Sequence, residues 1–233
     1  MDIEARVIRI KDNEISEKGA EVCIHSSKTL ENDIRIDKFD AVTPDEVGVG
    51  LIDYMIDWNY PWQGEVFDIA TGLKKTAYRT SNPAARIACA LSHYKLWRQC
   101  AGAAKPFLIL EHDAVFINKL DEQILWSNHQ IIGINNPLYA TRKAREFMEI
   151  ASKGKDNIVP VPTVDSVNVP QGLAGNSAYI IKPDGAKQML KLVKQYGLWP
   201  NDALMCKQFF PNELKVIYPY YTKLQPMQST TTL

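Results

Sequence analysis

Apolar and polar positions alternate at the start of the chain and predict a strand over residues 6–10. A helical periodicity follows over residues 14–30. The face that this helix is expected to bury holds Ile15, Val22, Cys23 and Ser26. Alternation returns over residues 34–42 and stops at Thr43-Pro44. Strand, helix and strand in this order predict a parallel βαβ unit.

The middle of the chain holds the clearest elements. Pro83 begins a helix that Ser81 or Asn82 can cap and that ends near residue 101. Five apolar residues at 106–110 predict a central strand covered on both faces. Residues 48–80 show no such periodicity, which predicts a long connection, either functional or mobile. Its aromatic side chains either pack in the core or form a surface on which a sugar ring stacks.

The second half of the chain alternates strands and helices. Residues 183–196 form an amphipathic pattern that Gly197 closes, which predicts a helix. Further strands are expected at 131–134, 177–181 and 215–218, a short helix at 202–210, an irregular loop at 159–175 and a fraying tail beyond 228. A basic, helix-prone stretch at 140–155 is interpreted as a solvated face; it holds Arg142, Lys143, Arg145, Lys153 and Lys155.

Composition narrows the class of protein. A chain of 233 residues is compatible with one domain over residues 1–233. Lys plus Arg and Asp plus Glu are 27 each, so the chain lacks the basic footprint of a nucleic-acid binder. The four cysteines form no CxxC pair, the first residues have no signal-peptide pattern, and no apolar run is long enough for a transmembrane segment. A cytoplasmic protein with reduced cysteines is expected.

Glu111 and Asp113 carry the sharpest chemical signal. They follow the buried strand directly, where open α/β sheets bind ligands. Alternate residues of an extended segment point the same way, so both carboxylates are expected to face one site and His112 to point elsewhere. Mg²⁺ and Mn²⁺ prefer oxygen ligands, commonly one or two carboxylates together with substrate phosphates. The pair therefore predicts a divalent metal bound together with a diphosphate.

Several blocks of the sequence resemble one enzyme family. They are ARIACALSHYKLW at 85–97, PFLILEHDA at 106–114, GNSAYIIKPDGAK at 175–187 and the closing segment at 218–230. Residues 39–43 are similar to the second strand of the same family. This order resembles glycosyltransferase family 25, which contains lipooligosaccharide and collagen galactosyltransferases. The resemblance covers most of the chain.

The resemblance implies a GT-A-type α/β fold: one Rossmann-like nucleotide-binding domain with a mixed, mostly parallel sheet. It also implies an inverting transfer of a sugar, most simply a hexose, from a UDP-sugar to the hydroxyl of a glycan or other acceptor, with Mn²⁺ or Mg²⁺ as cofactor. Glu111 and Asp113 then hold the metal and the diphosphate, and Asp202 is the catalytic base. The remaining assignments are Thr43, Arg86, Ser92 and His93 for the donor, and Asn176 and Trp199 for the acceptor, with Trp58 and Trp62 as further sugar contacts.

Other interpretations of these residues stay open. His93 is either a contact of the donor or a histidine that is satisfied within the core. Asp202 is either the catalytic base or the cap of a short helix. Arg86 either binds a donor phosphate or forms an ion pair at the surface. The chain departs from the family, which commonly has Glu at the position of Arg86 and Asp at that of His112, and it has no His beyond His129 to act as a late metal ligand. An inactive glycan- or nucleotide-binding protein, or a nucleotidyltransferase, are the alternatives.

Overall fold

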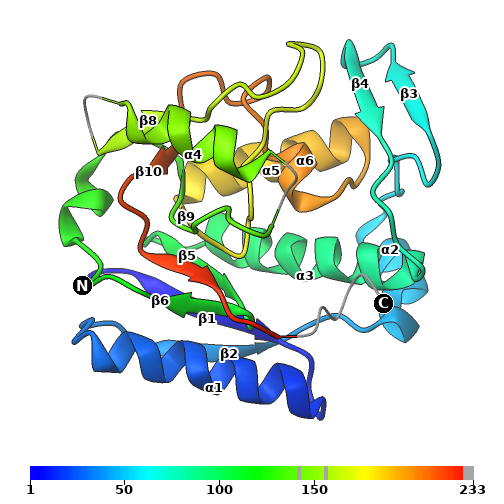
Figure 1. The fold of residues 1–233 in the computed structure, drawn as a ribbon. Coiled ribbons are helices and arrows are strands. Elements are labelled where there is room, and N and C mark those ends of the chain that lie inside the picture. The colour runs from blue at the N-terminus through cyan, green and yellow to red at the C-terminus, as the bar shows by residue number, and fades with distance from the viewer. Residues whose placement is uncertain (141–142, 155–156, 228–233) are drawn as a thin grey trace.

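The computed structural model describes residues 1–140, 143–154 and 157–227 (Figure 1). A seven-stranded sheet forms its centre. In spatial order the strands are β2 (Ile36–Asp40), β1 (Glu4–Arg9), β5 (Phe107–Glu111), β9 (Ala178–Ile181), β7 (Ile131–Gly133), β10 (Leu214–Ile217) and β8 (Ile158–Pro160). Helices cover both faces of this sheet, which makes the α/β layering expected from the sequence.

The sheet is mixed and mostly parallel, as predicted. β2, β1 and β5 are parallel neighbours, and β7 is parallel to β10. β9 runs antiparallel to both β5 and β7, and β8 runs antiparallel to β10. The unit of β1, α1 (Glu14–Thr29) and β2 confirms the predicted βαβ crossover.

The central strand β5 is buried on both faces, also as predicted. Phe107 and Ile109 pack into the core under α3 (Pro83–Ala101) and α5 (Pro183–Tyr196). Leu108 and Leu110 pack into the core on the opposite face, under α1. Only Glu111, the last residue of the strand, is partly exposed. The length of this apolar run therefore determines where the acidic residues lie, at the carboxyl end of β5.

The buried face of α1 differs from the prediction. Cys23 is buried as predicted, but Ile15 and Val22 are 42% and 40% exposed. The other buried positions are Ser16, Gly19, Ala20 and Ser27. Small residues let the helix approach the turn after β5: a Cβ on Gly19 would lie 2.7 Å from the carbonyl oxygen of His112. Close packing against that turn, and not the periodicity of apolar residues, determines which face of α1 is buried.

Residues 48–80 hold more regular structure than predicted. They contain most of α2 (Val47–Tyr54) and a hairpin of β3 (Glu65–Asp68) and β4 (Leu73–Thr76). Asp68 and Lys75 form an ion pair of 2.9 Å in which the lysine side chain is only 3% exposed. The two strands of the hairpin are short and largely polar. Their alternation of apolar and polar residues is therefore too brief to distinguish them from a loop in the sequence.

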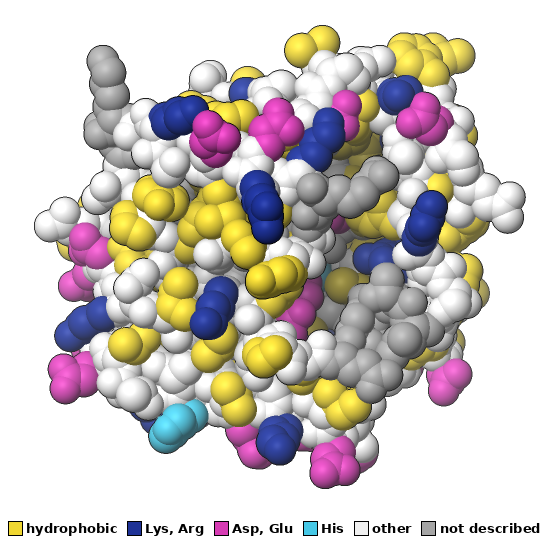
Figure 2. All heavy atoms as spheres, in the orientation of Figure 1, with side chains coloured by type: hydrophobic (Ala, Val, Ile, Leu, Met, Phe, Trp, Pro, Cys, Tyr) yellow, Lys and Arg dark blue, Asp and Glu magenta, His cyan; other side chains and the backbone are white. Residues whose placement is uncertain are grey.

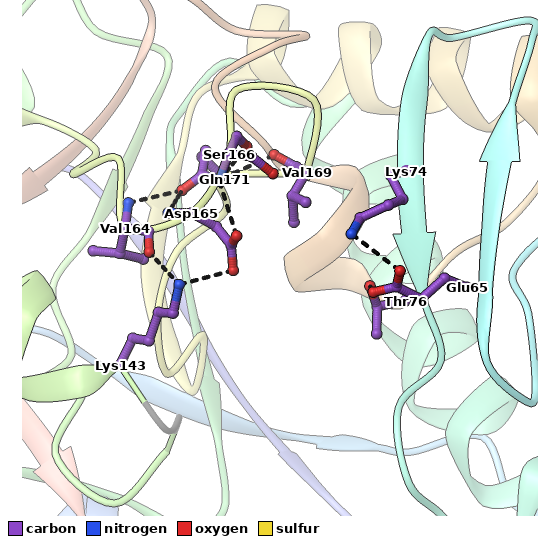
Figure 3. Close-up of polar contacts among 9 residues, drawn as sticks. All are labelled: Glu65, Lys74, Thr76, Lys143, Val164, Asp165, Ser166, Val169 and Gln171. Carbon is purple, nitrogen blue, oxygen red and sulfur yellow. Dashed lines mark hydrogen bonds and ion pairs between the residues drawn. The ribbon is translucent and has the colours of Figure 1, made fainter.

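The 159–175 stretch is irregular after β8, as expected, and side chains hold it in place (Figure 3). The amide of Gln171 accepts from the Val164 N–H at 2.9 Å and donates to the Val169 carbonyl at 3.0 Å. Lys143 pairs with Asp165 at 2.9 Å, while Lys74 and Glu65 form a separate ion pair in the hairpin.

The remaining predicted elements occur close to their expected positions. They are α4 (Ala144–Ser152) and α6 (Asn201–Leu204), which is shorter than the helix expected over 202–210. A second pair of strands, β6 (Ala114–Phe116) with β11 (Thr222–Leu224), is not among the expected elements. Single 3-10 turns occupy Pro44–Glu46 and Glu122–Trp126. Arg142, Lys155 and the tail from residue 228 lie outside the described residues. Each helix in the described part of the chain is too short or too polar to cross a bilayer.

Candidate active site

A cavity of about 1300 Å³ opens at the carboxyl ends of β1, β2 and β5. The first half of α3, the residues before β9, the helix α6 and the segment 223–227 complete its walls. Figure 2 shows the hollow near the middle of this face, with acidic side-chain atoms inside it. Open α/β sheets place ligands at this edge, so the cavity lies where the sequence predicts a site.

The cavity gathers almost all the predicted site residues. Those that line it are Thr43, Arg86, Ser92, His93, Glu111, Asp113, Asn176 and Asp202. Trp199 is the exception: its side chain is 0% exposed and packs in the core, with the Lys75 ammonium 4.4 Å from its ring centroid. A sugar cannot stack on a ring that is fully covered, so the prediction for Trp199 is wrong. Trp58 and Trp62 are also absent from the lining and stack on each other at 5.0 Å.

A buried chain of hydrogen bonds holds Glu111. Its Oε1 lies 3.1 Å from Nε2 of His93, and the other ring nitrogen of His93 lies 2.8 Å from the hydroxyl of Tyr179. Trp97 donates its indole N–H to the same hydroxyl at 2.8 Å. His93, Tyr179 and Trp97 are each at most 1% exposed. His93 is therefore a buried histidine with both ring nitrogens hydrogen-bonded, and its Nε2 holds the Glu111 carboxylate at the cavity wall.

Asp113 lies in the turn between β5 and β6. Burial, followed by the charge of Glu111, raises the pKa of Asp113 to about 7, against a hydrogen bond from Ser177 that lowers it. Its Oδ1 is buried and has no hydrogen-bond partner among the described residues. Two carboxylates that repel each other, one with an unsatisfied oxygen, could hold a cation between them.

The sequence predicts that His112 points away from the site, but the residue is part of the cavity wall. β5 ends at Glu111, so the strand alternation stops before His112, and His112 lines the cavity together with its neighbours. Its carbonyl accepts from Gln225 at 3.0 Å. Burial lowers the pKa of its imidazole.

Ser92 and Thr43 are engaged with the protein. The Ser92 hydroxyl donates to the Ala88 carbonyl at 2.8 Å and accepts from the Val42 N–H at 2.9 Å, which ties α3 to the end of β2. The Thr43 hydroxyl bonds the Glu46 carboxylate at 3.0 Å in a capping box. Ser92 thus positions the backbone around Thr43 at the cavity wall.

Asp202 lies in the first turn of α6 and is not its N-cap, which is Pro200. Burial raises the pKa of Asp202, with a smaller contribution from the Glu111 charge, while Arg86 and a hydrogen bond with Tyr78 lower it. The guanidinium of Arg86 lies 5.5 Å from the centroid of the Tyr78 ring. A buried carboxylate with a raised pKa and a fixed orientation is suited to accept a proton.

Arg86 and Asn176 carry unsatisfied polar atoms into the cavity. Arg86 Nε and Asn176 Oδ1 are both buried and lack a hydrogen-bond partner among the described residues. Arg86 forms no ion pair within hydrogen-bond distance in the described part of the chain. Buried polar atoms are normally satisfied, so these two are candidates for ligand contacts.

Sequence patterns did not predict four residues at the site. Tyr78 and Tyr179 contact site residues from distant segments, and no local spacing links them to Asp202 or His93. Lys223 and Gln225 line the cavity from the closing segment, whose family resemblance is visible in the sequence. Gln225 donates to the carbonyls of Gly19, His112 and Ala114, and its N–H donates to the Asp113 carbonyl at 2.7 Å.

Comparisons with known proteins identify the family. No curated protein matches the sequence. Among solved structures, apo mouse xyloside xylosyltransferase 1 is similar, with a TM-score of 0.42, 12% identity, and coverage of 93% of this chain and 85% of that one. Residues 24–205 match the model of glycosyltransferase family 25, described as an LPS biosynthesis protein. The family match and the mixed sheet agree with the GT-A-type fold class. Because the match covers most of its length, the chain belongs to glycosyltransferase family 25 and is a glycosyltransferase enzyme.

Proposed function

We propose that the protein is a metal-dependent, inverting glycosyltransferase that moves a hexose from a UDP-sugar to an acceptor hydroxyl, within one domain spanning residues 1–233. One observation carries the proposal: Glu111 and Asp113 share a single cavity with Asp202, whose carboxyl is buried and has a raised pKa. Such a site has one acidic pair for a cation and a separate carboxylate for a proton.

Glu111 and Asp113 would hold the metal. The unpartnered Oδ1 of Asp113 and the mutual repulsion of the two carboxylates fit a divalent cation, and an all-oxygen donor pair favours Mn²⁺ or Mg²⁺. When bound, such an ion stabilises negative charge on the departing diphosphate. His93 fixes Glu111 for this role, and Gln225 fixes the turn that carries Asp113.

Asp202 would act as the base. In one displacement, the acceptor oxygen forms a bond to the anomeric carbon as the bond from that carbon to the diphosphate oxygen breaks. The acceptor proton passes to the Asp202 carboxylate. Attack from the face opposite the leaving group inverts the anomeric centre. The hydrogen bond with Tyr78 holds Asp202 in place for this transfer.

Cationic and polar groups complete the donor and acceptor sites. Arg86 and the exposed Lys223 line the same cavity and would contact the diphosphate, which Arg86 can bind by its bidentate fork. The backbone near Thr43, held by Ser92, would contact the nucleoside at the end of β2. Asn176, with its free Oδ1, would bind an acceptor or sugar hydroxyl.

The test is turnover of a panel of UDP-sugars, measured as released nucleotide, with Mn²⁺ and with a chelator. We expect metal-dependent hydrolysis or transfer for one donor. Glu111→Gln should weaken donor binding and Asp202→Asn should keep binding but lose turnover, while the exposed Asp184→Asn should behave as wild type. Binding of a UDP-sugar without turnover, in the presence of a screened acceptor set, would favour the inactive binding protein instead.

A further inference from the structure

We propose that the cavity holds a second cation site, formed by Cys89, His93 and Glu111, that takes a soft divalent ion such as Zn²⁺ or Co²⁺. One ligand atom from each residue lies within 4.8 Å of the other two. This site is distinct from the proposed oxygen site of Glu111 and Asp113, although the two share Glu111. The inference therefore concerns the proposed active site and does not require that transfer occurs.

The fold places the three ligands on one wall. Cys89 and His93 are four residues apart on α3, so their side chains project from the same face of the helix. Glu111 ends the neighbouring strand β5, and its Oε1 is already 3.1 Å from His93 Nε2. That separation is slightly shorter than the roughly 3.3–3.4 Å between two ligands of one tetrahedral ion with bonds of about 2.0–2.1 Å, so a small side-chain shift would admit the ion. Cys89 would complete the set by a side-chain rotation.

His93 has the second contact that metal-binding histidines usually have. Its Nδ1 lies 2.8 Å from the Tyr179 hydroxyl, and Trp97 donates to that hydroxyl from the other side. In the ion-free protein the Nε2–H of His93 donates to Glu111; on ion binding the ring proton moves to Nδ1 and is donated to the Tyr179 hydroxyl, which leaves the Nε2 lone pair for the ion. A ligating histidine that donates its other N–H to a fixed acceptor is held in orientation and made more basic.

The donor atoms decide which ion fits. Thiolate, imidazole and carboxylate together suit zinc or cobalt, whereas Mn²⁺ and Mg²⁺ prefer the oxygen-only pair. The thiol must release its proton to solvent on binding. Cys89 is the cysteine that lines the cavity; Cys23, Cys100 and Cys206 are buried in the core. Since both sites need Glu111, an ion at the soft site should compete with Mn²⁺.

The experiment is Co²⁺ titration of the metal-free full-length protein, without nucleotide or sugar, followed by absorption spectroscopy. A thiolate ligand gives a sulfur-to-cobalt charge-transfer band in the near ultraviolet. We expect the band in wild type and in the control Cys23→Ser, and its loss in Cys89→Ser. Zn²⁺ affinity, measured by competition with a chelating dye, should fall by about tenfold or more in Cys89→Ser.

Two results would overturn the site: Co²⁺ binding to wild type without a charge-transfer band, or a band of equal intensity in Cys89→Ser. His93→Gln gives a second check through Zn²⁺ affinity, with circular dichroism to show that the buried substitution leaves the fold intact. Failure of UDP-sugar turnover would leave all these readouts unaffected, so this inference and the proposed function fail separately.

Discussion

Replacing Asp113 with Asn should stabilise the metal-free protein at neutral and alkaline pH. Asp113 is buried beside Glu111, and its pKa is raised to about 7. Relative to the ordinary value of 3.8, this corresponds to a cost of up to ~4 kcal/mol for the ionised side chain, at about 1.36 kcal/mol per pKa unit. The figure is an upper limit because Glu111 shares the repulsion.

The pH dependence follows from the sign of this pKa change. Below pH 3.8 the carboxyl is protonated in both folded and unfolded chains, so the variant gains nothing. As pH rises towards about 7, the unfolded chain has lost its proton and the folded one still holds it, so wild type loses stability. Above that pH the full cost is present. The amide that replaces the carboxyl in Asp113→Asn has no proton to lose, while its carbonyl can still accept from Ser177.

Urea unfolding from pH 4 to pH 8 in a chelator measures this directly. The stability difference between Asp113→Asn and wild type should grow with pH, while the exposed Asp184→Asn should follow wild type throughout. Saturating Mn²⁺ should narrow the difference, since an ion at 100 times its Kd stabilises wild type by about 2.7 kcal/mol. A variant less stable than wild type at pH 8 in chelator, or a pH-independent difference, would refute the electrostatic account.

Three further substitutions test other parts of the site. Asp202→Asn should lower turnover strongly, and the residual kcat/KM should lack the acidic limb that the raised pKa of Asp202 gives the wild-type profile; both are measured by donor consumption against pH. Ser92→Ala should cost about 1–3 kcal/mol in urea unfolding because it orphans the buried Val42 N–H, and it should raise the donor KM. Gly172→Ala should destabilise the fold and lower kcat, since its Cβ would lie 1.8 Å from the carbonyl oxygen of Asp202; unchanged unfolding would contradict this.

Local signals predicted the elements that carry the acidic site. The apolar run before Glu111 encodes a strand buried on both faces, and that burial determines where the strand ends. Pro83 with its Asn82 cap, and Pro183 with Gly197, mark helices whose observed bounds match the expected ones closely. Such signals depend on a few neighbouring residues, so one sequence suffices to detect them.

Contacts between distant segments could not be predicted in the same way. Tyr78 reaches Asp202 across more than a hundred residues, and Tyr179 reaches His93 across 86. Trp199 lies three residues before Asp202 in the sequence, which favours a contact with the sugar, but its ring is buried in the core. Proximity along the chain does not fix the direction of a side chain at a helix start.

The departures from the family pattern have a consistent physical interpretation in this cavity. His112 replaces a carboxylate at a position whose backbone carbonyl, bonded to Gln225, already fixes the turn, so the Glu111 and Asp113 pair remains available. Arg86 adds a positive charge that lowers the pKa of Asp202, opposing the burial and the Glu111 charge that raise it. A Glu at that position would instead add a third carboxylate near Asp202 and make the proposed base harder to ionise. Both departures are therefore compatible with the proposed division into a cation-binding pair and a separate proton acceptor.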